Sequence, residues 1–333
     1  MYKLKKGDTI GIVAPSAPVS AFCPRRMRRG VEAIERMGYK IKLGSTVNKI
    51  EDYSAGTIAE RVDDMHKMFL DPEVKAIMTT IGGYNANDLL DKLDYNLIRN
   101  NNNKLFIGYS DITVLLFALM KKSGVQTIMG PMVLPQFGEF PDILNFTKKS
   151  FELMISSIGM DKEYALPISA ENTEEMLSWD KEDDRARKMN KNEGWKIIFR
   201  GNAEGRLLAA NLNTLCKLIG TEYMIDTNGS ILFIEDDDEE SASTLQRMLQ
   251  QFKQAKLLDG VCGIVFGRFQ KKSDITEEKL KKLLLNVFGE VDIPIISGVD
   301  FGHTDPILSL PMGKTVKIST QGESVSILIR SLQ

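Results

Sequence analysis

The sequence predicts an α/β protein in which a doubly wound parallel sheet precedes a second, strand-rich mixed α/β domain. The chain has 333 residues, 43% of them hydrophobic, and this length favours two domains over one. Its first half alternates short β-branched runs with stretches of helical length, as parallel strands joined by helical crossovers do. A charged segment separates this half from a more strand-rich second half. We place the domains at 1–165 and 196–333, with 166–195 as a linker or long surface loop.

The expected elements follow the hydrophobic periodicity along the chain. In the first half, strands are expected at Thr9–Ala14, Tyr39–Leu43, Ala76–Ile81 and Leu105–Tyr109, and helices at Arg25–Met37, at Ala59–Leu70, from Asn87 and from Ile112. In the second half, the expected strands are Ile197–Arg200, Ser230–Ile234, Gly263–Phe266, Ile293–Gly298 and Thr315–Ile329, and the helices lie near Ala210–Ile219, Ser241–Ala255 and Glu277–Val287. Ligands of parallel sheets bind beyond the carboxyl ends of the strands, so we look for a site there.

Composition and charge exclude several classes of protein. The 43 Lys and Arg residues nearly balance the 45 Asp and Glu residues, so no overall field attracts nucleic acid or an anionic membrane. The run Thr9–Ala14 is too short for a signal-peptide core, and no stretch reaches about 18 uncharged apolar residues. Three cysteines without a C-x-x-C pattern argue against a disulfide framework or a zinc site. We expect a soluble cytoplasmic protein that binds a small or peptide-like ligand, with no nucleic-acid or membrane partner.

Ser110 is the first candidate for chemistry. It follows the predicted strand Leu105–Tyr109 and precedes a predicted helix, so it stands at a strand-to-helix corner. Such a corner exposes the hydroxyl and points the following N–H groups at a developing oxyanion, as in a nucleophile elbow. The pattern is not G-x-S-x-G, because Ile112 stands where the second glycine would be. The alternative interpretation is that Ser110 or Asp111 only caps the helix.

His303 is one of only two histidines in the chain. It lies in the loop after the predicted strand Ile293–Gly298, where an imidazole that titrates near neutrality can accept the serine proton and return it to a leaving group. A structural histidine bonded to local backbone is the alternative. His66, in contrast, is expected on the exposed face of a helix as a solvated residue.

Glu235 is the candidate third member of a catalytic triad, because it directly follows the predicted strand Ser230–Ile234 at the end of the sheet where a ligand is expected. A carboxylate there holds the imidazole tautomer and stabilises its cation. Glu235 also begins the acidic run Glu235–Glu240, which alternatively forms a solvated turn that caps the next helix, or a Mg²⁺ or Ca²⁺ site. We favour one functional residue, Glu235, followed by capping charge.

The loop Thr80–Asp88 also closes a strand and opens a helix. Its glycines, Gly82 and Gly83, let backbone N–H groups approach an anion closely, and the loop is placed to complete an oxyanion hole with the Asp111 N–H. The alternative is a tight connection in which Asn87 or Asp88 is the helix N-cap.

Six segments together resemble the LD-carboxypeptidase family of serine peptidases and span nearly the whole chain. They are Gly7–Ser16, Ile81–Tyr84, Gly108–Asp111, Gly205–Leu212, Phe233–Asp236 and Phe301–His303. Each segment is short, but their shared order is specific. The resemblance implies a triad of Ser110, Glu235 and His303, with the backbone N–H groups of Gly83 and Asp111 as the oxyanion hole.

The same resemblance implies a flavodoxin-like first domain that carries the nucleophile, a second domain that carries the other two triad residues, and an active site in the cleft between them. It also implies no metal, no organic cofactor and commonly a homodimer. The residues expected to bind the substrate are Gly82, Tyr84, Trp179, Arg206 and Asn211.

Two branches of the family act on different substrates. One removes the terminal D-alanine of murein tetrapeptides in cell-wall recycling, and the other confers immunity to the antibiotic microcin C by cutting the amide between its aminoacyl group and a modified nucleotide. The segment with Leu177–Asp180 and Asn192–Trp195 resembles an extra loop of the second branch, whose Trp stacks on the nucleobase. The run Glu235–Asp237 also lacks the Glu-Asp-Val form associated with murein enzymes. We expect an amidase for microcin C-type aminoacyl-nucleotides, with Trp179 stacking and Trp195 packed at the entry to the second domain.

Three other functions stay open. Murein carboxypeptidase activity is the alternative within the family. A non-catalytic nucleotide- or sugar-binding module would use the Gly82–Gly83 loop as an anion cradle and Ser110 as a cap. A metal-dependent hydrolase would use the acidic run that begins at Glu235.

Overall fold

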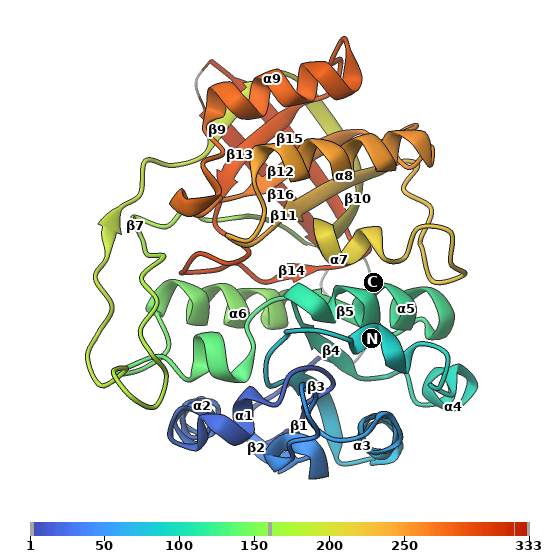
Figure 1. The fold of residues 1–333 in the computed structure, drawn as a ribbon, viewed down its shortest axis with the longest axis vertical. Helices are drawn as coiled ribbons and strands as arrows, with labels where there is room; N and C mark the ends of the chain where they lie inside the picture. Colours follow the sequence, from blue (N-terminus) through green and yellow to red (C-terminus); the bar gives the residue numbers. More distant parts are fainter. Residues whose placement is uncertain (1–2, 159–161, 323, 332–333) are drawn as a thin grey trace.

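The computed structural model describes residues 3–158, 162–322 and 324–331. Within these ranges the chain forms a six-stranded sheet of order β14-β5-β4-β3-β1-β2, an eight-stranded sheet of order β6-β16-β15-β10-β11-β12-β13-β9, and the short pair β7-β8. Figure 1 shows the first sheet with its helices in the lower half of the view and the second sheet in the upper half. The predicted fold class, a parallel-sheet α/β domain followed by a strand-rich one, is confirmed.

The first sheet is parallel except at β14, which pairs antiparallel with β5. Its strands are β1 (Thr9–Val13), β2 (Lys40–Leu43), β3 (Val74–Thr79), β4 (Leu105–Gly108), β5 (Gln126–Met129) and β14 (Leu310–Pro311). The helices around it are α1 (Val19–Phe22), α2 (Pro24–Arg36), α3 (Ile58–Leu70), α4 (Tyr95–Asn100), α5 (Thr113–Ser123) and α6 (Asn145–Ser157).

Alternating side chains along β4 show that both faces of this sheet are covered. Leu105 and Ile107 join the apolar cluster that includes residues of α2 and α6, whereas Phe106 joins the cluster that includes residues of α3 and α5. This alternation is the strand period of two, and it makes the sheet doubly wound. The helix expected from Asn87 is different: a short 3-10 turn comes first, and α4 begins only after Asp94, whose carboxylate accepts the N–H groups of Asn96 and Leu97.

The second sheet has a parallel centre, β10 to β13, flanked by antiparallel strands. Its strands are β6 (Lys162–Ala165), β9 (Lys196–Phe199), β10 (Asn202–Asn211), β11 (Ser230–Glu235), β12 (Gly263–Gly267), β13 (Ile295–Val299), β15 (Thr315–Gln321) and β16 (Ser324–Ser331). Its helices are α7 (Leu212–Cys216), α8 (Ala242–Gln254) and α9 (Glu277–Phe288), and the separate pair is β7 (Glu171–Asn172) and β8 (Asn190–Lys191).

Three features of the second half differ from the expectation. The central strand β10 occupies a stretch for which no strand was expected, and the helix after it begins at Leu212 because the Asn211 side chain caps it by accepting the Thr214 N–H. The run Thr315–Ile329 is a hairpin of two strands, β15 and β16. The chain also crosses between the sheets more often than the domain limits imply. Strand β6, which ends at residue 165, already pairs in the second sheet, and β14 returns to the first.

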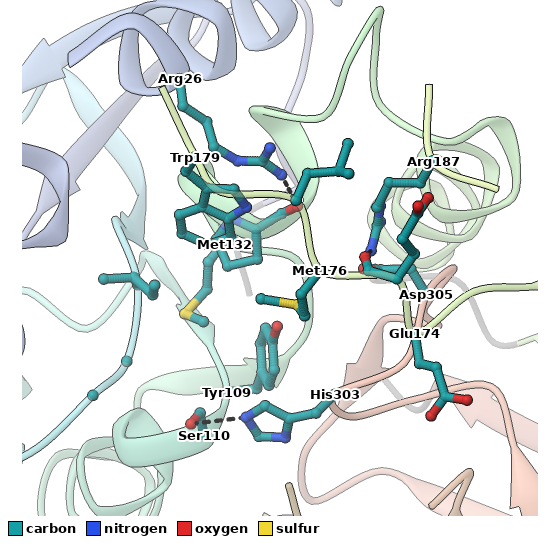
Figure 2. A pocket seen from close by; sticks show the side chains of 16 residues that line it. Arg26, Tyr109, Ser110, Met132, Glu174, Met176, Trp179, Arg187, His303 and Asp305 are labelled. Atoms are coloured by element: carbon teal, nitrogen blue, oxygen red, sulfur yellow. Dashed lines mark hydrogen bonds and ion pairs between the residues drawn. The ribbon is translucent and has the colours of Figure 1, made fainter. Parts of the chain in front are cut away.

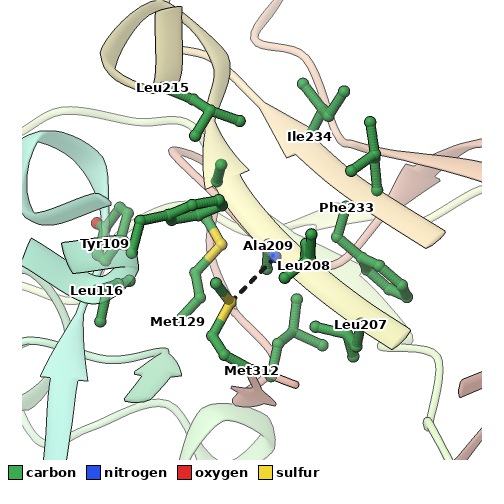
Figure 3. Close-up of a cluster of buried hydrophobic side chains, with 14 of the residues drawn as sticks. Tyr109, Leu116, Met129, Leu207, Leu208, Ala209, Leu215, Phe233, Ile234 and Met312 are labelled. Atoms are coloured by element: carbon green, nitrogen blue, oxygen red, sulfur yellow. Dashed lines mark hydrogen bonds between the residues drawn. The ribbon is translucent and has the colours of Figure 1, made fainter. Parts of the chain in front are cut away.

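Helix α5 joins the two halves. Its residues Val114–Leu119 are all fully buried, because the first sheet covers one side of the helix and the second domain covers the other. A helix that is apolar on every face is stable only in such a place. Figure 3 shows this shared core, in which Leu116 and Met129 of the first domain lie near Leu208 and Met312, next to the second sheet. The Ala209 N–H donates to the Met312 sulfur at 3.0 Å.

Among the residues that the structure describes, no helix has the length and apolar character needed to cross a membrane.

Gly30 of α2 should tolerate no side chain. A Cβ atom there would lie 2.6 Å from the carbonyl oxygen of Val133, which is backbone and cannot rotate away. We expect Gly30→Ala to lower the free energy of unfolding by about 1–3 kcal/mol through overpacking, measured by chemical denaturation. Arg28→Ala is the matched control, since Arg28 lies on the same helix with a side chain that is 71% exposed. Equal stability of both variants and the wild type would contradict this packing.

Candidate active site

Ser110 stands at a strained corner between β4 and α5. Its φ angle is +63°, a left-handed conformation that costs a residue with a Cβ atom of order 1–3 kcal/mol. Gly108 permits the sharp exit of the chain, because a Cβ there would lie 2.6 Å from Thr79 Oγ1 and 2.8 Å from Ile112 Cγ2. The corner has the backbone form of a nucleophile elbow, with a short 3-10 turn leading into the helix.

His303 and Glu235 complete a hydrogen-bonded chain with Ser110. His303 Nε2 lies 3.1 Å from Ser110 Oγ, and His303 Nδ1 lies 2.6 Å from Glu235 Oε2. Glu235 ends β11 and is 1% exposed. Two glycines make room for it: a Cβ at Gly302 would meet Glu235 Oε2 at 2.5 Å, and one at Gly267 would meet its Cβ at 2.9 Å. The structure therefore brings together three residues that are up to 193 positions apart.

The His303 ring is held in a negative environment. Burial alone would lower the pKa of His303, but the adjacent Glu235 carboxylate outweighs it, with help from Asp237 and Asp236, and raises this pKa to about 9. The edge of Tyr109 also packs on the ring, with centroids 5.3 Å apart. Such a histidine is a strong base once deprotonated, and its cation is stabilised by a fixed anion.

The Gly82–Gly83 loop packs directly on the serine corner. A Cβ at Gly82 would lie 2.9 Å from Ser110 Cβ and 3.1 Å from the Asp111 nitrogen, so only glycine permits this approach. Gly83 has a φ angle of +122°, and a Cβ there would lie 2.4 Å from Ala17. The Asp111 N–H has no acceptor within its own helical turn, because it lies at the turn's start. The backbone here can thus present donors to an anion beside the serine hydroxyl.

A pocket of about 190 Å³ opens onto Ser110 and His303. Figure 2 shows these two side chains at one end of the view and Trp179, next to the Arg26 guanidinium, at the other. Most of the far wall comes from residues 173–188, which we call the strap. The lining residues for which the sequence predicted no role of their own are Arg26, Ile81, Tyr109, Met132, Pro135, Glu174, Glu175, Met176, Leu177, Arg187 and Asp305.

Buried charge pairs hold the strap in place. Asp183 is 1% exposed and pairs with Arg26 at 3.1 Å and Arg29 at 2.5 Å, although this segment was expected to be a linker or long surface loop. The Asp180 carboxylate accepts the Arg25 and Arg26 N–H groups, each at 2.7 Å, at the start of α2.

At its other end the strap is tied to the histidine loop. Arg187 pairs with both Glu139 and Asp305, each at 2.7 Å. Thr173 and Asp305 also exchange two backbone hydrogen bonds. The arginine-rich start of α2, opposite an acidic segment, was the one signal in the sequence that could have revealed part of this network.

The expected substrate-binding residues divide into two groups. Gly82 and Trp179 line the pocket, and the Arg26 guanidinium carbon lies 4.3 Å from the centre of the Trp179 ring. Tyr84 is 61% exposed and lies outside the pocket lining, with its hydroxyl 3.4 Å from Glu239.

Asn211 and Arg206 also lie outside the pocket lining. Asn211 is buried and caps α7, and its side-chain amide donates to Asp236. Arg206 pairs in register with Ser230, at the opposite end of β11 from Glu235. Ser230 and Glu235 are five positions apart along the strand, a distance on the order of 17 Å. Arg206 therefore lies far from the pocket, whereas Asn211 lies beside Glu235 on the neighbouring strand.

The acidic run after Glu235 is partly buried. Asp236 is 3% exposed and accepts hydrogen bonds from the Asn211 side chain and the Asn213 N–H. Burial of the carboxyl group, and then the charges of Glu235 and Asp237, raise the pKa of Asp236 to about 8. The side-chain cap of α8 is Ser241, which directly follows the run. Within the described ranges no group of three or more His, Cys, Asp or Glu side chains is arranged to hold a metal ion.

His66 differs from the expectation of a solvated side chain. It is half-buried, and its Nε2 accepts the Asp94 N–H at 2.9 Å. Trp195 lies at the start of the second domain, as predicted, and its indole N–H donates to the fully buried Asp300 at 2.9 Å.

Comparison with known proteins places this geometry in a family. Models of the LD-carboxypeptidase N-terminal and C-terminal domains match residues 10–130 and 204–318. The chain belongs to the LD-carboxypeptidase family. It is a serine-type carboxypeptidase or amidase, and not a non-catalytic binding module.

Relatives carry two kinds of name. The microcin C7 self-immunity protein MccF of Escherichia coli is 36% identical, covering 97% of this chain and 94% of its own. The putative carboxypeptidase YocD of Bacillus subtilis is also 36% identical, covering 95% and 94%. A probable murein peptide carboxypeptidase of Bacillus subtilis is 32% identical, covering 97% and 92%.

Solved structures agree over the whole chain. An MccF-like protein from Bacillus anthracis superposes with a TM-score of 0.91 at 36% identity, covering 99% of this chain and 98% of its own. MccF in complex with glutamyl sulfamoyl guanosine has a TM-score of 0.90 at 34% identity, with the same coverage.

The pH dependence of activity should report the His303–Glu235 pair. A base must be neutral, and because Glu235 raises the pKa of His303 to about 9, we expect kcat/KM to rise with pH up to about that value. Glu235→Gln removes the anion, so burial should lower the pKa of His303 and move this rise to lower pH, with kcat reduced about 10²–10⁴-fold.

Asp238→Asn is the matched control, since Asp238 belongs to the same acidic run but pairs with Lys272 at the surface, 3.2 Å away. Its pH profile should match that of the wild type. Identical profiles for Glu235→Gln and the wild type would rule out the proposed coupling.

Proposed function

We propose that this enzyme hydrolyses the amide that joins an aminoacyl group to a nucleotide in microcin C-type compounds, and so detoxifies them. The observation that carries the proposal is Trp179, a half-buried aromatic ring that lines the same pocket as Ser110. A ring at this place can stack on a nucleobase while the acyl carbonyl meets the serine. Similarity to MccF, whose solved complexes hold glutamyl sulfamoyl guanosine and aspartyl sulfamoyl adenosine, supports it.

In the proposed mechanism, Ser110 is the nucleophile. Its hydroxyl oxygen attacks the amide carbonyl as His303 takes the proton, and Glu235 keeps the imidazole in the tautomer that can accept it. Backbone N–H groups of Gly83 and Asp111 stabilise the oxyanion. His303 then protonates the leaving amine, and a water that it activates releases the aminoacyl group from Ser110.

The shape of the pocket supports a planar leaving group. Apolar side chains of Met132, Met176 and Leu177 line the same pocket as the serine, and Trp179 adds a flat surface. Arg26 is itself 3% exposed and already paired with Asp183, so it orients the Trp179 ring rather than offering a free cation.

Removal of D-alanine from murein tetrapeptides is the second candidate function. It is favoured by the murein peptide carboxypeptidase relative and by the same serine chemistry. That substrate ends in a free carboxylate, which calls for an available cation. Arg187, at the pocket wall, is instead bound to two carboxylates, those of Glu139 and Asp305.

Homodimer formation and a cytoplasmic location remain predictions.

The substrate should be identified by direct competition of the two chemistries. We expect the purified enzyme to release a free amino acid from an aminoacyl sulfamoyl adenosine faster than it releases D-alanine from a murein tetrapeptide. Both products are measured by chromatography. Ser110→Ala should lower both rates by several orders of magnitude while the thermal transition stays unchanged. Hydrolysis of the tetrapeptide alone would overturn the proposed substrate.

Trp179 should matter only for the nucleotide. We expect Trp179→Ala to lower kcat/KM for the aminoacyl sulfamoyl adenosine about 10- to 100-fold, because base stacking contributes about 1–3 kcal/mol, with kcat/KM for the tetrapeptide changed less than about threefold. Trp179→Phe keeps a ring and should retain most of the activity. Equal losses for both substrates would show that the residue only supports the strap.

A further inference from the structure

We propose that the side chains of Asp111 and Ser16 form a clamp that positions both halves of the oxyanion hole. The inference rests on the proposed serine mechanism and adds two positioning residues to it. The carboxylate and the hydroxyl touch no substrate atom in this assignment. They act by fixing the backbone on which the donor N–H groups of Gly83 and Asp111 lie.

One carboxylate oxygen is the centre of the clamp. Asp111 Oδ2 accepts the Ser16 hydroxyl at 2.5 Å and the Ala86 N–H at 2.9 Å. Ser16 Oγ also lies 3.0 Å from the carbonyl oxygen of Tyr84. Residues on both sides of the Gly83 turn are therefore tied to the residue that follows the nucleophile.

The clamp connects three neighbouring strands. Ser16 follows β1, Ala86 lies in the loop after β3, and Asp111 follows β4, and these strands are adjacent in the order β4-β3-β1. The Ala17 N–H adds a backbone bond to the Gly82 carbonyl at 3.2 Å. Loops at the carboxyl ends of parallel strands have no ladder to hold them, so side-chain bonds must set their relative position.

Burial makes these bonds effective. Ser16 is fully buried and Asp111 is 6% exposed, so water competes little for them. The cost of that burial raises the pKa of Asp111, and the Ser16 and Ala86 hydrogen bonds counter it. A buried carboxylate is retained where its partners are specific, and here both donors come from loops that border the serine.

A helix cap alone does not explain this arrangement. Asp111 lies in the first turn before α5, yet its carboxylate accepts from other loops and not from the turn's own N–H groups. Loss of a cap would destabilise the helix, whereas loss of the clamp should impair the transition state. Loss of the clamp should therefore lower kcat, whereas loss of a cap should lower the stability.

The test compares the rates at which a fluorophosphonate labels Ser110, because this reaction also places a negative oxygen in the oxyanion hole and needs no knowledge of the substrate. We expect Ser110 of the Asp111→Ala variant to be labelled about 10²-fold more slowly than in the wild type, which is the loss typical of one oxyanion donor. We expect the same loss in the rate of turnover at saturating substrate. Ser16→Ala should lose about tenfold. KM should stay within about twofold, since the interaction strengthens only in the transition state.

Conservative and matched variants separate positioning from folding. Asp111→Asn keeps an oxygen that can accept both donors, so it should recover most of what Asp111→Ala loses. Ser20→Ala is the control, because Ser20 is equally buried and donates to the Val47 carbonyl at 2.6 Å, away from the serine loops. Its labelling rate should match that of the wild type.

Outcomes for the clamp and for the enzyme mechanism are distinguishable. A wild-type protein that the fluorophosphonate does not label lacks an activated serine, and this overturns the proposed function together with the clamp. A labelled wild type with Ser16→Ala and Asp111→Ala equally reactive overturns the clamp alone. If Asp111→Ala fails to fold, Ser16→Ala still decides the question, since it removes only one hydroxyl.

Discussion

The contact between the start of α5 and the carboxyl end of β10 is the constraint on which the site depends. The Asn211 N–H donates to Thr113 Oγ1 at 3.1 Å, and Asn211 lies in register with Glu235 on the neighbouring strand. This interdomain hydrogen bond thus relates the serine corner to the strand end that carries Glu235. The fully buried apolar helix behind it gives this contact its rigidity, because close-packed interiors resist small displacements.

The far wall of the pocket is held by a different kind of interaction from the serine corner. The serine corner, Glu235 and the glycine loop are set by strand ends and tight backbone contacts. The strap, in contrast, has little regular structure and is held by buried ion pairs, such as that of Asp183 with Arg26 and Arg29. Breaking one partner of such a pair leaves a buried charge uncompensated, so the pairs fix one conformation more than they add stability.

Much of this arrangement could be predicted from the sequence. Strand ends and scarce histidines pointed to Ser110, Glu235 and His303, because those signals are local. The pocket wall could not be predicted, because it depends on ion pairs between residues far apart in the sequence. Asp183 pairs with Arg26 and Arg29, which precede it by 157 and 154 positions. The position of Arg206 was missed for a related reason: the stretch that contains it was not recognised as strand β10, so its distance from the site could not be predicted.

The path of the chain near its end has a consequence for biosynthesis. After β13 the chain passes through His303, adds β14 to the edge of the first sheet, and only then returns to make β15. Domains of many proteins fold in order as they emerge from the ribosome. Here the first sheet is not complete until β14 at residues 310–311 has been made, and Ser110 has no histidine beside it until residue 303 has been made. A nascent chain that ends before residue 303 therefore lacks both the histidine beside Ser110 and the last strand of the first sheet.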